Sequence, residues 1–598
     1  MKYHKSRIIL ITYVLFFAVL FLQFPLKGDL PGNTDTWAAL AFSNSYFNII
    51  KAAFSGEKLG VFMYPAQNPH VYGESSIGIA AVFIIFKFLG FNDINAYYLL
   101  MVTLFSLTAF SVYLLTKLYL KNDYAAVFAG LYFTCSNYTF GNIDDPIIVF
   151  FCLVALCFYF LKKYFIEGQV KFLYTASVLG GIQVYFSAYL FLFLCIGCGI
   201  LLLFHFRLLS KDIYLVKSFV IAIFLIGTIA GPFFYTYFSH KANSDFYNPY
   251  NPSAVAQLHS LNPIDFTRVL PNNLVRSYTP KTTLDLKEDI KKFKSLNVTS
   301  SPIVPRDGGS ILYGPVLDDE ELYYVSTRIC ANLGIFICVL SVLGFFARFQ
   351  GRNELLVIGI LGVCLALGPG VVVADKIFPG PMIILYKYVP LSGFLRVPTR
   401  AFFLTLLCMS IYAGNGLIYI MRKARIEALR PRVLFTCIAA LLFFVENIPV
   451  PLPSFGAKAY AYPQKEYAVF LGKKDIDVIL NLPSNPGIGL AGDYKDLHSW
   501  ARECIYMNWQ TYHKKNILNG LNGYFPRSRL EVQKLIQQLP GRDAVEALKN
   551  KYDLDCIIFH KNLIISEDET RLFYNMKRSE YFNVELETEE LLILKFSI

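Results

Sequence analysis

The segment PGNTDTW, residues 31–37, places the carboxylate of Asp35 a few residues after the first long apolar run of the chain. An acid in such a loop is either an ordinary polar residue or a general base, a group that takes a proton from an attacking hydroxyl. Trp37 follows two positions later and offers an aromatic face to a substrate. The choice depends on the side of the membrane that this loop faces and on the residues that share that side.

A second acidic pair stands in the segment GNIDDP, where Asp144 and Asp145 separate two apolar runs. Pro146 suits the first position of a helix, so Asp145 can serve as its N-cap. Asp144 has no such role, and acids near hydrocarbon are costly unless they serve a site or face a water-filled cavity. We therefore expect Asp144, and Asp145 if it does more than cap, to share a pocket with Asp35.

Cations occur together in the segment GFLRVPTRAFF, which contains Arg396 and Arg400, and in ILYKYVP just before it, which contains Lys387. Pro398 restricts Val397 to extended geometry, which predicts an irregular segment at the membrane interface. Arginine there can bind a phosphate with two parallel hydrogen bonds. The alternative is that these side chains reach lipid headgroups without binding a substrate.

A weaker pattern suggests a metal site in the first polar loop. His70 and Glu74 are four residues apart and would meet on a helix, but Pro69 and Gly73 favour a loop. Together with Asp144 they leave a divalent metal (Mg²⁺, Mn²⁺ or Zn²⁺) as an open option, and no cofactor is certain.

Two tyrosines, Tyr185 and Tyr189, stand in the segment YFSAY between two apolar runs. Tyrosines at this depth usually anchor a helix at the membrane interface. They can also stack on a sugar ring, and we include them with Trp37 as candidate sugar-contacting residues.

The composition requires a membrane protein with several spans. Of 598 residues, 55% are hydrophobic and only 16% are charged, whereas soluble domains carry about 25% charged residues. The net charge of +12 fits basic residues collected in cytoplasmic loops better than a nucleic-acid partner. The chain contains no Walker loop, no dinucleotide-binding glycine pattern, no HExxH and no nucleophile elbow, which argues against a nucleotide-linked donor.

The basic segment MKYHKSR precedes the first apolar run, so the N-terminus is predicted to be cytoplasmic and Asp35 to be outside. Residues 76–90 are predicted to form an interfacial or half-inserted helix, because a crossing there would put the later basic loops outside. About eleven crossings remain, and an odd number places the C-terminus outside. The predicted spans are 8–24, 96–115, 124–140, 147–161, 172–187, 189–206, 218–234, 329–346, 355–373, 401–419 and 433–445.

The predicted fold is therefore an all-α polytopic membrane protein with a C-terminal extracytoplasmic α/β domain. Residues 1–448 form the membrane part, with large outer loops at 26–95 and 237–327, and residues 449–598 form the outer domain. In that domain strand-like segments (DVILNLP, DLDCIIFH, ELLILKF) alternate with helix-like ones (RLEVQKLIQQL, DAVEALKNKY). Cys504 and Cys556 leave a disulfide open.

Several stretches, in order along most of the chain, resemble the GT-C superfamily of membrane glycosyltransferases, in particular a broad bacterial and archaeal branch of it. The resemblance implies a sugar donor on a polyprenyl phosphate, Asp35 as the catalytic base, and Asp144 or Asp145 as an assisting or metal-binding acid. The chain lacks the paired Asp-Glu of several members and the WWDYG-type motif of oligosaccharyltransferases. The stretches are PGNTDTW, YPAQNPHVYGES, AAVFAGLYFTCSNYTFGNIDD, NPIDFTRVLPNN, LSGFLRVPTRAFF and YMNWQTYHKKNILNGLNGYFP.

The sequence thus predicts an inverting membrane glycosyltransferase that acts at the outer face of the cell membrane. The expected partners are a polyprenyl-phosphate sugar, an extracytoplasmic glycan or lipid acceptor, and membrane lipids. Two alternatives remain open: a lipid-linked glycan flippase or other transporter, and a non-catalytic accessory with the same fold. Transporters tend to carry charges near the middle of the bilayer, whereas the acids of this chain gather at one surface.

Overall fold

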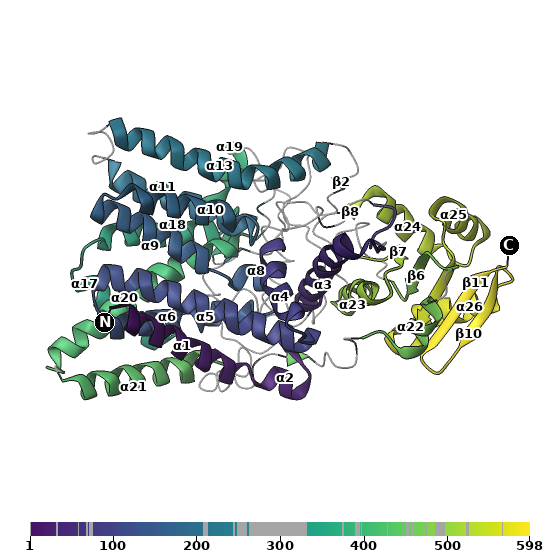
Figure 1. The fold of residues 1–598 in the computed structure, drawn as a ribbon, viewed down its shortest axis with the longest axis horizontal. Coiled ribbons are helices and arrows are strands. Elements are labelled where there is room, and N and C mark those ends of the chain that lie inside the picture. The colour runs from purple at the N-terminus through teal and green to yellow at the C-terminus, as the bar shows by residue number, and fades with distance from the viewer. Residues whose placement is uncertain are drawn as a thin grey trace.

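A bundle of long helices is joined at one end to a smaller domain of helices and strands, on which the C-terminus lies (Figure 1). The structure is a computed structural model. It describes residues 2–31, 34–57, 59–66, 70, 76–206, 213–242, 246–247, 260–261, 332–373, 376–388, 395, 397–426, 428–449, 452, 454–455, 460, 462–472, 475–484, 497–521, 525–564 and 566–597.

Each of the eleven predicted spans contains an α-helix, and five helical stretches of the described residues are long and apolar enough to cross a membrane. The most apolar part of α20 is 94% buried, so this helix forms the centre of the bundle, whereas that of α13 is only 11% buried. The helices that correspond to the eleven predicted spans are α1 (Lys2–Leu20), α5 (Asp93–Leu120), α6 (Asp123–Thr134), α9 (Cys152–Glu167), α10 (Val170–Gln183), α11 (Ala188–Phe204), α13 (Ile213–Ala242), α17 (Ile335–Phe346), α18 (Arg352–Ala366), α20 (Phe402–Lys423) and α21 (Leu429–Asn447).

Short elements lie at the end of the bundle that carries the smaller domain. The helix α4 (Ile77–Phe88) has 12 residues, fewer than the ~20 that a span needs, and packs on α3 and α5. The longer helix α3 (Thr34–Ser55) also lies at this end. The other short elements are α2 (Gln23–Lys27), β1 (Leu30–Pro31), α7 (Asn137–Gly141), α8 (Pro146–Val149), β2 (Phe246–Tyr247), β3 (Gly370–Val373), β4 (Lys376–Pro379), α19 (Met382–Tyr388) and the 3₁₀ turn η5 (Pro398–Ala401).

Glycines allow α17 and α20 to pack with their backbones in contact. A methyl group on Gly344 would overlap the carbonyl oxygen of Tyr412, and one on Gly416 would overlap that of Leu340. Asn415 donates from Nδ2 to the carbonyl oxygen of Gly344 at 2.7 Å. Small residues at such crossings let helices approach closely, which is a common way to pack helices inside a membrane.

A buried polar cluster joins four helices at the end of the bundle farthest from the smaller domain. Lys162 Nζ lies 2.5 Å from Glu354 Oε1, and both side chains are almost fully buried. Tyr119 donates to the same carboxylate at 2.7 Å, and His205 Nε2 lies 3.2 Å from its other oxygen. The buried carboxylate of Glu354 therefore has an ammonium, a hydroxyl and an imidazole as partners.

The C-terminal domain contains a five-stranded sheet with the strand order β10-β11-β9-β6-β7. β6 is parallel to β7 and to β9, whereas β11 is antiparallel to β9 and to β10. Each predicted strand-like segment contains one of these strands. Their bounds are β6 (Val478–Leu482), β7 (Asn516–Ile517), β9 (Cys556–His560), β10 (Phe582–Glu587) and β11 (Leu591–Phe596).

Helices cover both faces of this sheet, because strand side chains alternate between the faces. Leu480 and Ile557 share one core with α24, α25 and α26, whereas Ile479 and Ile558 point to the opposite face, toward α22 and α23. The domain is therefore an α/β sandwich with three layers. Its remaining elements are β5 (Ser454–Phe455), α22 (Lys465–Leu471), α23 (Leu497–His513), β8 (Phe525–Pro526), α24 (Arg527–Gln537), α25 (Arg542–Tyr552), η6 (Lys561–Leu563) and α26 (Glu567–Arg578).

Among the contacts of described residues that tie this domain to the bundle, four are made by strand pairing, helix packing or backbone hydrogen bonds. Strand β1 pairs with β5, strand β2 pairs with β8, and α3 packs along α23. The fourth contact is made by the first outer loop, which runs along β7: Ile517 N donates to the Val61 carbonyl at 2.9 Å, and Tyr64 N donates to the Ile517 carbonyl at 3.0 Å. The loop thus covers an edge strand that would otherwise expose its backbone.

Candidate active site at the end of the helical bundle

Asp35 lies in the first turn of α3. An acid is favourable there because the unpaired N–H groups of a helix start carry partial positive charge. The next residue, Thr36, is fully buried, and its hydroxyl lies 2.6 Å from the Pro31 carbonyl oxygen and 3.2 Å from that of Asp144. The start of α3 is thereby joined to the second acidic segment.

Asp144 and Asp145 are both buried at the turn before α8. Asp145 caps this helix by accepting from the Ile147 N–H at 3.1 Å, and Pro146 occupies the first turn. The predicted cap is therefore present. The same carboxylate also pairs with Arg400, whose Nη2 lies 3.3 Å from Asp145 Oδ2. Capping and a site role are thus compatible for Asp145.

Arg400 lies on η5, directly before the central helix α20. Its side chain is 12% exposed, and its guanidinium lies 4.4 Å from the centre of the Tyr189 ring. A cation over an aromatic face is stabilised by the ring's electron density. Arg400 therefore points into the protein toward Asp145, and the predicted irregular segment is a 3₁₀ turn that follows Val397.

Tyr97, which the sequence did not single out, lies one turn into α5 and is fully buried. Its hydroxyl is near enough to Asp35, Asp144 and Asp145 to interact electrostatically with all three carboxylates. A side chain of α5 therefore interacts electrostatically with acids of two segments that are distant in the sequence. Nothing in the apolar stretch around Tyr97 distinguishes it from a lipid-facing tyrosine, which is why sequence reasoning missed it.

The C-terminal domain borders this site through α23. Burial raises the pKa of the Cys504 thiol well above its usual range, and the nearby charges of Asp35 and Glu503 add to this effect. Cys504 and Cys556 are both buried and carry free thiols, so the disulfide left open by the sequence does not form. The domain therefore packs, through α23, on the helix that carries Asp35.

The other predicted site residues lie in different surroundings. Tyr189 packs under Arg400, whereas Tyr185 donates to the Ile229 carbonyl of α13 at 2.9 Å. Trp37 is 2% exposed and belongs to the core. Lys387 is exposed at the end of α19, over the ring of its neighbour Tyr388. Arg396 lies outside the described residues.

His70 does not take part in a metal site within the described chain. Its ring is stacked on Tyr46, with Phe42 and Phe62 at its edges, and Nε2 lies 3.1 Å from the Ser45 hydroxyl. Burial lowers its pKa to about 4. Glu74 lies outside the described residues, and elsewhere in the described chain no three His, Cys, Asp or Glu side chains group as metal ligands. A metal that also uses Glu74 remains a prediction, and the mechanism proposed below uses described residues alone.

No protein-family model matches the chain, and no curated protein matches it. Among solved structures, it is similar to ArnT from Cupriavidus metallidurans bound to undecaprenyl phosphate, with a TM-score of 0.39 and 11% sequence identity. The similarity covers 98% of this chain and 97% of that one.

Proposed function

We propose that the chain is a membrane glycosyltransferase of the GT-C type, which transfers a sugar from a polyprenyl-phosphate donor to an extracytoplasmic glycan or lipid acceptor. The observation that carries the proposal is the grouping of Asp35, Asp144, Asp145 and Arg400 at one end of the bundle, beside the C-terminal domain. Acids and a guanidinium brought together there from three segments are suited to deprotonate an acceptor and to bind a phosphate.

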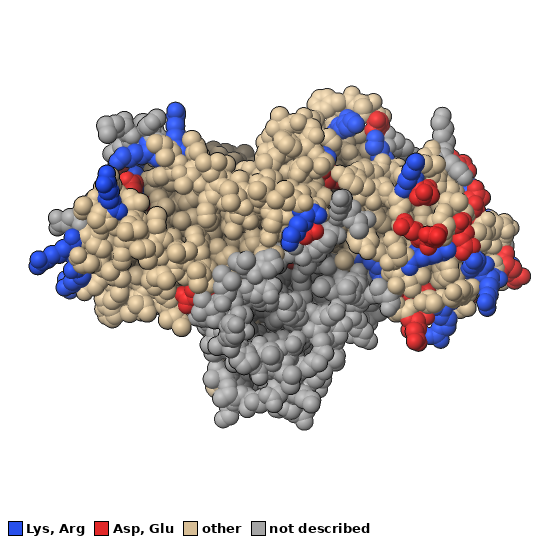
Figure 2. Space-filling view, turned by 90° about the horizontal axis from the view of Figure 1, so that it is seen from below, with Lys and Arg blue, Asp and Glu red and all other residues tan. Residues whose placement is uncertain are grey.

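The orientation that this function needs is supported by the charges at the two ends of the bundle. Figure 2 shows Lys and Arg gathered at the end opposite the C-terminal domain, and charges of both signs over that domain. Helices α5 and α20 start at the site and end with Lys117 and with Arg422 and Lys423 in their last turns. Basic helix ends favour the cytoplasm, so the site and the C-terminal domain would face outward.

In the proposed reaction Asp35 acts as the general base. The acceptor hydroxyl attacks the anomeric carbon from the face opposite the phosphate and gives its proton to the Asp35 carboxylate. A bond forms between the acceptor oxygen and the anomeric carbon as the bond from that carbon to the phosphate oxygen breaks. The leaving polyprenyl phosphate takes the electron pair, and the configuration inverts. General-base help of this kind contributes about 10²–10⁴ in rate.

Arg400 stabilises the charge that builds up on the departing phosphate. Its guanidinium is held between the Asp145 carboxylate and the Tyr189 ring, which fixes the direction of its N–H groups before the donor binds. Preorganised donors of this kind are effective because they need no rearrangement as charge develops.

The test is transfer of radiolabelled sugar from polyprenyl-phosphate donors by membranes that contain the wild type, Asp35→Asn or the control Asp29→Asn. Asp29 is an acid of the same loop, six positions earlier. We expect labelled product with the wild type and Asp29→Asn, and a loss of about 100-fold or more with Asp35→Asn.

Full activity of Asp35→Asn would contradict the assignment of the base. If none of the three proteins transfers label while lipid-linked glycan still changes leaflet, the transporter alternative replaces the proposal.

A further inference from the structure

Helix α23 lies between the sheet of the C-terminal domain and α3, the helix that carries Asp35 in its first turn (Figure 1). Polar contacts between described residues join α23 to α3. Asn44 Nδ2 donates to Asn508 Oδ1 at 3.2 Å, and Asn48 Nδ2 donates to the Thr511 carbonyl at 2.5 Å. Asn508 and Thr511 lie on the face of α23 that packs along α3. A rotation or shift of α23 would therefore move α3, the helix that carries Asp35.

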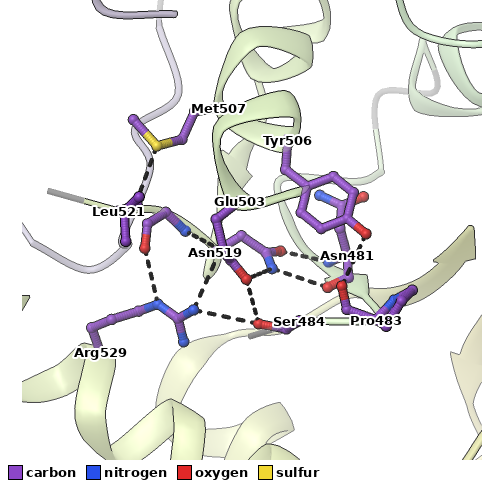
Figure 3. Close-up of polar contacts among 10 residues, drawn as sticks. Asn481, Pro483, Ser484, Glu503, Tyr506, Met507, Asn519, Leu521 and Arg529 are labelled. Atoms are coloured by element: carbon purple, nitrogen blue, oxygen red, sulfur yellow. Dashed lines mark hydrogen bonds and ion pairs between the residues drawn. The ribbon is translucent and has the colours of Figure 1, made fainter. Parts of the chain in front are cut away.

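The residue next to Cys504, Glu503, faces the sheet and is held by a buried network (Figure 3). Its carboxylate accepts from the Ser484 hydroxyl at 2.6 Å and from the Gly520 N–H at 2.8 Å. Arg529 Nη2 lies 3.4 Å from it, and Asn519 Nδ2 lies 3.5 Å from it. The partners come from the ends of β6 and β7 and from α24, so one side chain fixes α23 against three elements.

Stability alone does not account for this network. The side chains of Glu503 and Arg529 are both fully buried. Removing two charges from water costs nearly as much as their attraction returns, and hydrophobic replacements of such pairs are often at least as stable. What a buried ion pair provides is a fixed geometry, because each carboxylate oxygen must stay aligned with its donors.

We propose that Glu503 is a positioning residue for Asp35: it fixes α23 on the sheet, and α23 in turn fixes α3, the helix that carries Asp35 in its first turn. The inference rests on the proposed glycosyltransferase function, in which Asp35 takes a proton. It makes the C-terminal domain part of the machinery that aligns the base, in addition to a surface that an acceptor can touch. Glu503 itself makes no contact with a reacting atom.

The chain offers a matched control on the same helix. Arg502 directly precedes Glu503, is also buried, and pairs with Glu569 of α26 at 2.7 Å. It donates to the Leu563 carbonyl at 2.7 Å as well. This ion pair joins α23 to α26 and η6, whereas Glu503 contacts the 519–521 segment after β7. Arg502→Met and Glu503→Gln should therefore disturb the domain comparably and differ in their effect on Asp35.

The first measurement is steady-state transfer by full-length protein. Glu503→Gln keeps the length of the side chain but removes its charge and one acceptor oxygen. We expect kcat to fall about 10- to 100-fold with the donor KM unchanged, because small displacements of a catalytic group cost rate more than binding. Arg502→Met should retain the wild-type kcat in the folded fraction. Equal kcat values for Glu503→Gln and the wild type would overturn the proposal.

The second measurement does not depend on activity. Hydrogen exchange at the backbone amides of residues 34–38, the first turn of α3, should become faster in Glu503→Ala and stay unchanged in Arg502→Met. Unchanged exchange in Glu503→Ala would overturn the positioning role even if the enzyme is active. If Asp35→Asn keeps full activity while the exchange result holds, the base assignment fails and the mechanical link between Glu503 and α3 remains.

Discussion

The Nη2 atom of Arg400 lies 3.3 Å from the Oδ2 atom of Asp145, across 255 positions of the sequence. The contact joins the start of the central helix α20 to the turn before α8, and Asp145 also caps α8. A single carboxylate therefore holds both a helix end and the candidate phosphate-binding side chain. The two tasks can be separated by mutation.

Asp145→Asn should leave α8 intact and weaken donor binding. Asparagine caps helices as well as aspartate does, but it cannot form the ion pair that orients Arg400. We expect a raised donor KM with little change in thermal stability, measured by transfer kinetics and thermal unfolding in detergent. Equal losses of stability and activity would indicate that Asp145 serves the fold only.

Arg400→Met should lower kcat/KM for the donor about 10- to 100-fold, with a raised donor KM as part of the loss, the cost of losing a charge-assisted hydrogen bond. Lys387→Ala removes an exposed cation of the same stretch and serves as the control. We expect Lys387→Ala to change the donor KM much less, because its ammonium lies over the ring of Tyr388 at the surface. A larger loss with Lys387→Ala than with Arg400→Met would assign phosphate binding to α19.

Gly344→Ala and Gly416→Ala should each destabilise the bundle. The added methyl group would overlap a carbonyl oxygen of the facing helix, so α17 and α20 must separate. Overpacking of this kind costs about 1–3 kcal/mol. Gly227→Ala is the control, since a methyl group added there would meet open space. Thermal unfolding in detergent measures the difference, and equal melting temperatures for all three variants would contradict the close packing.

The C-terminal domain should lose stability in mild acid because two neutral histidines are buried in it. Burial lowers the pKa of His513 and of His560 to about 3 in each case. His513 accepts from Lys515 N at Nδ1, so its proton lies on Nε2, which contacts the Tyr467 hydroxyl at 3.2 Å. Below pH ~6.5 the unfolded chain binds protons that the folded domain does not. The free energy of unfolding therefore falls by roughly 1 kcal/mol for each histidine and each pH unit.

The stability from these neutral histidines is thus complete above pH ~6.5 and is lost progressively between about pH 6.5 and pH 3. His513→Gln should reduce the difference in melting temperature between pH ~7 and pH ~5. Thermal unfolding of the full-length protein at the two pH values tests this, and an unchanged difference would assign the acid sensitivity to other groups.

The cluster at the far end of the bundle should show the behaviour of a buried ion pair. Lys162→Met alone or Glu354→Gln alone leaves one unpaired charge, at a cost of about 3–5 kcal/mol. The double variant removes both charges and should recover most of the loss. Melting temperatures of the single and double variants in detergent measure the coupling. Strictly additive losses would show that the two residues act independently.

Much of the fold could be predicted from the sequence because apolar runs of spanning length have few other uses. Asp145 was recognised as a cap because Pro146 follows it, and the irregular turn at Arg400 because of Pro398. Local chemistry fixes such features. The strands β6, β9 and β11 were also predicted from short apolar runs between polar segments.

The contacts between these features could not be predicted, because they depend on how the helices pack. Nothing near Arg400 in the sequence indicates Asp145 as its partner, and Tyr97 resembles other tyrosines of apolar helices. Helix α23 was missed for a different reason. Its buried residues face two partners, the sheet and α3, so its sequence lacks the single apolar stripe that marks an amphipathic helix.

The contact of the first outer loop with β7 and Asn516 can form only late in the synthesis of the chain. Val61 bonds to Asn516, 455 positions later, and at ~5–20 residues per second a ribosome needs about 20–90 s to cover that distance. During this interval Asp35 is already made but has no α23 beside it. A nascent chain therefore has α3 without its packing partner α23 until the C-terminal domain has been translated.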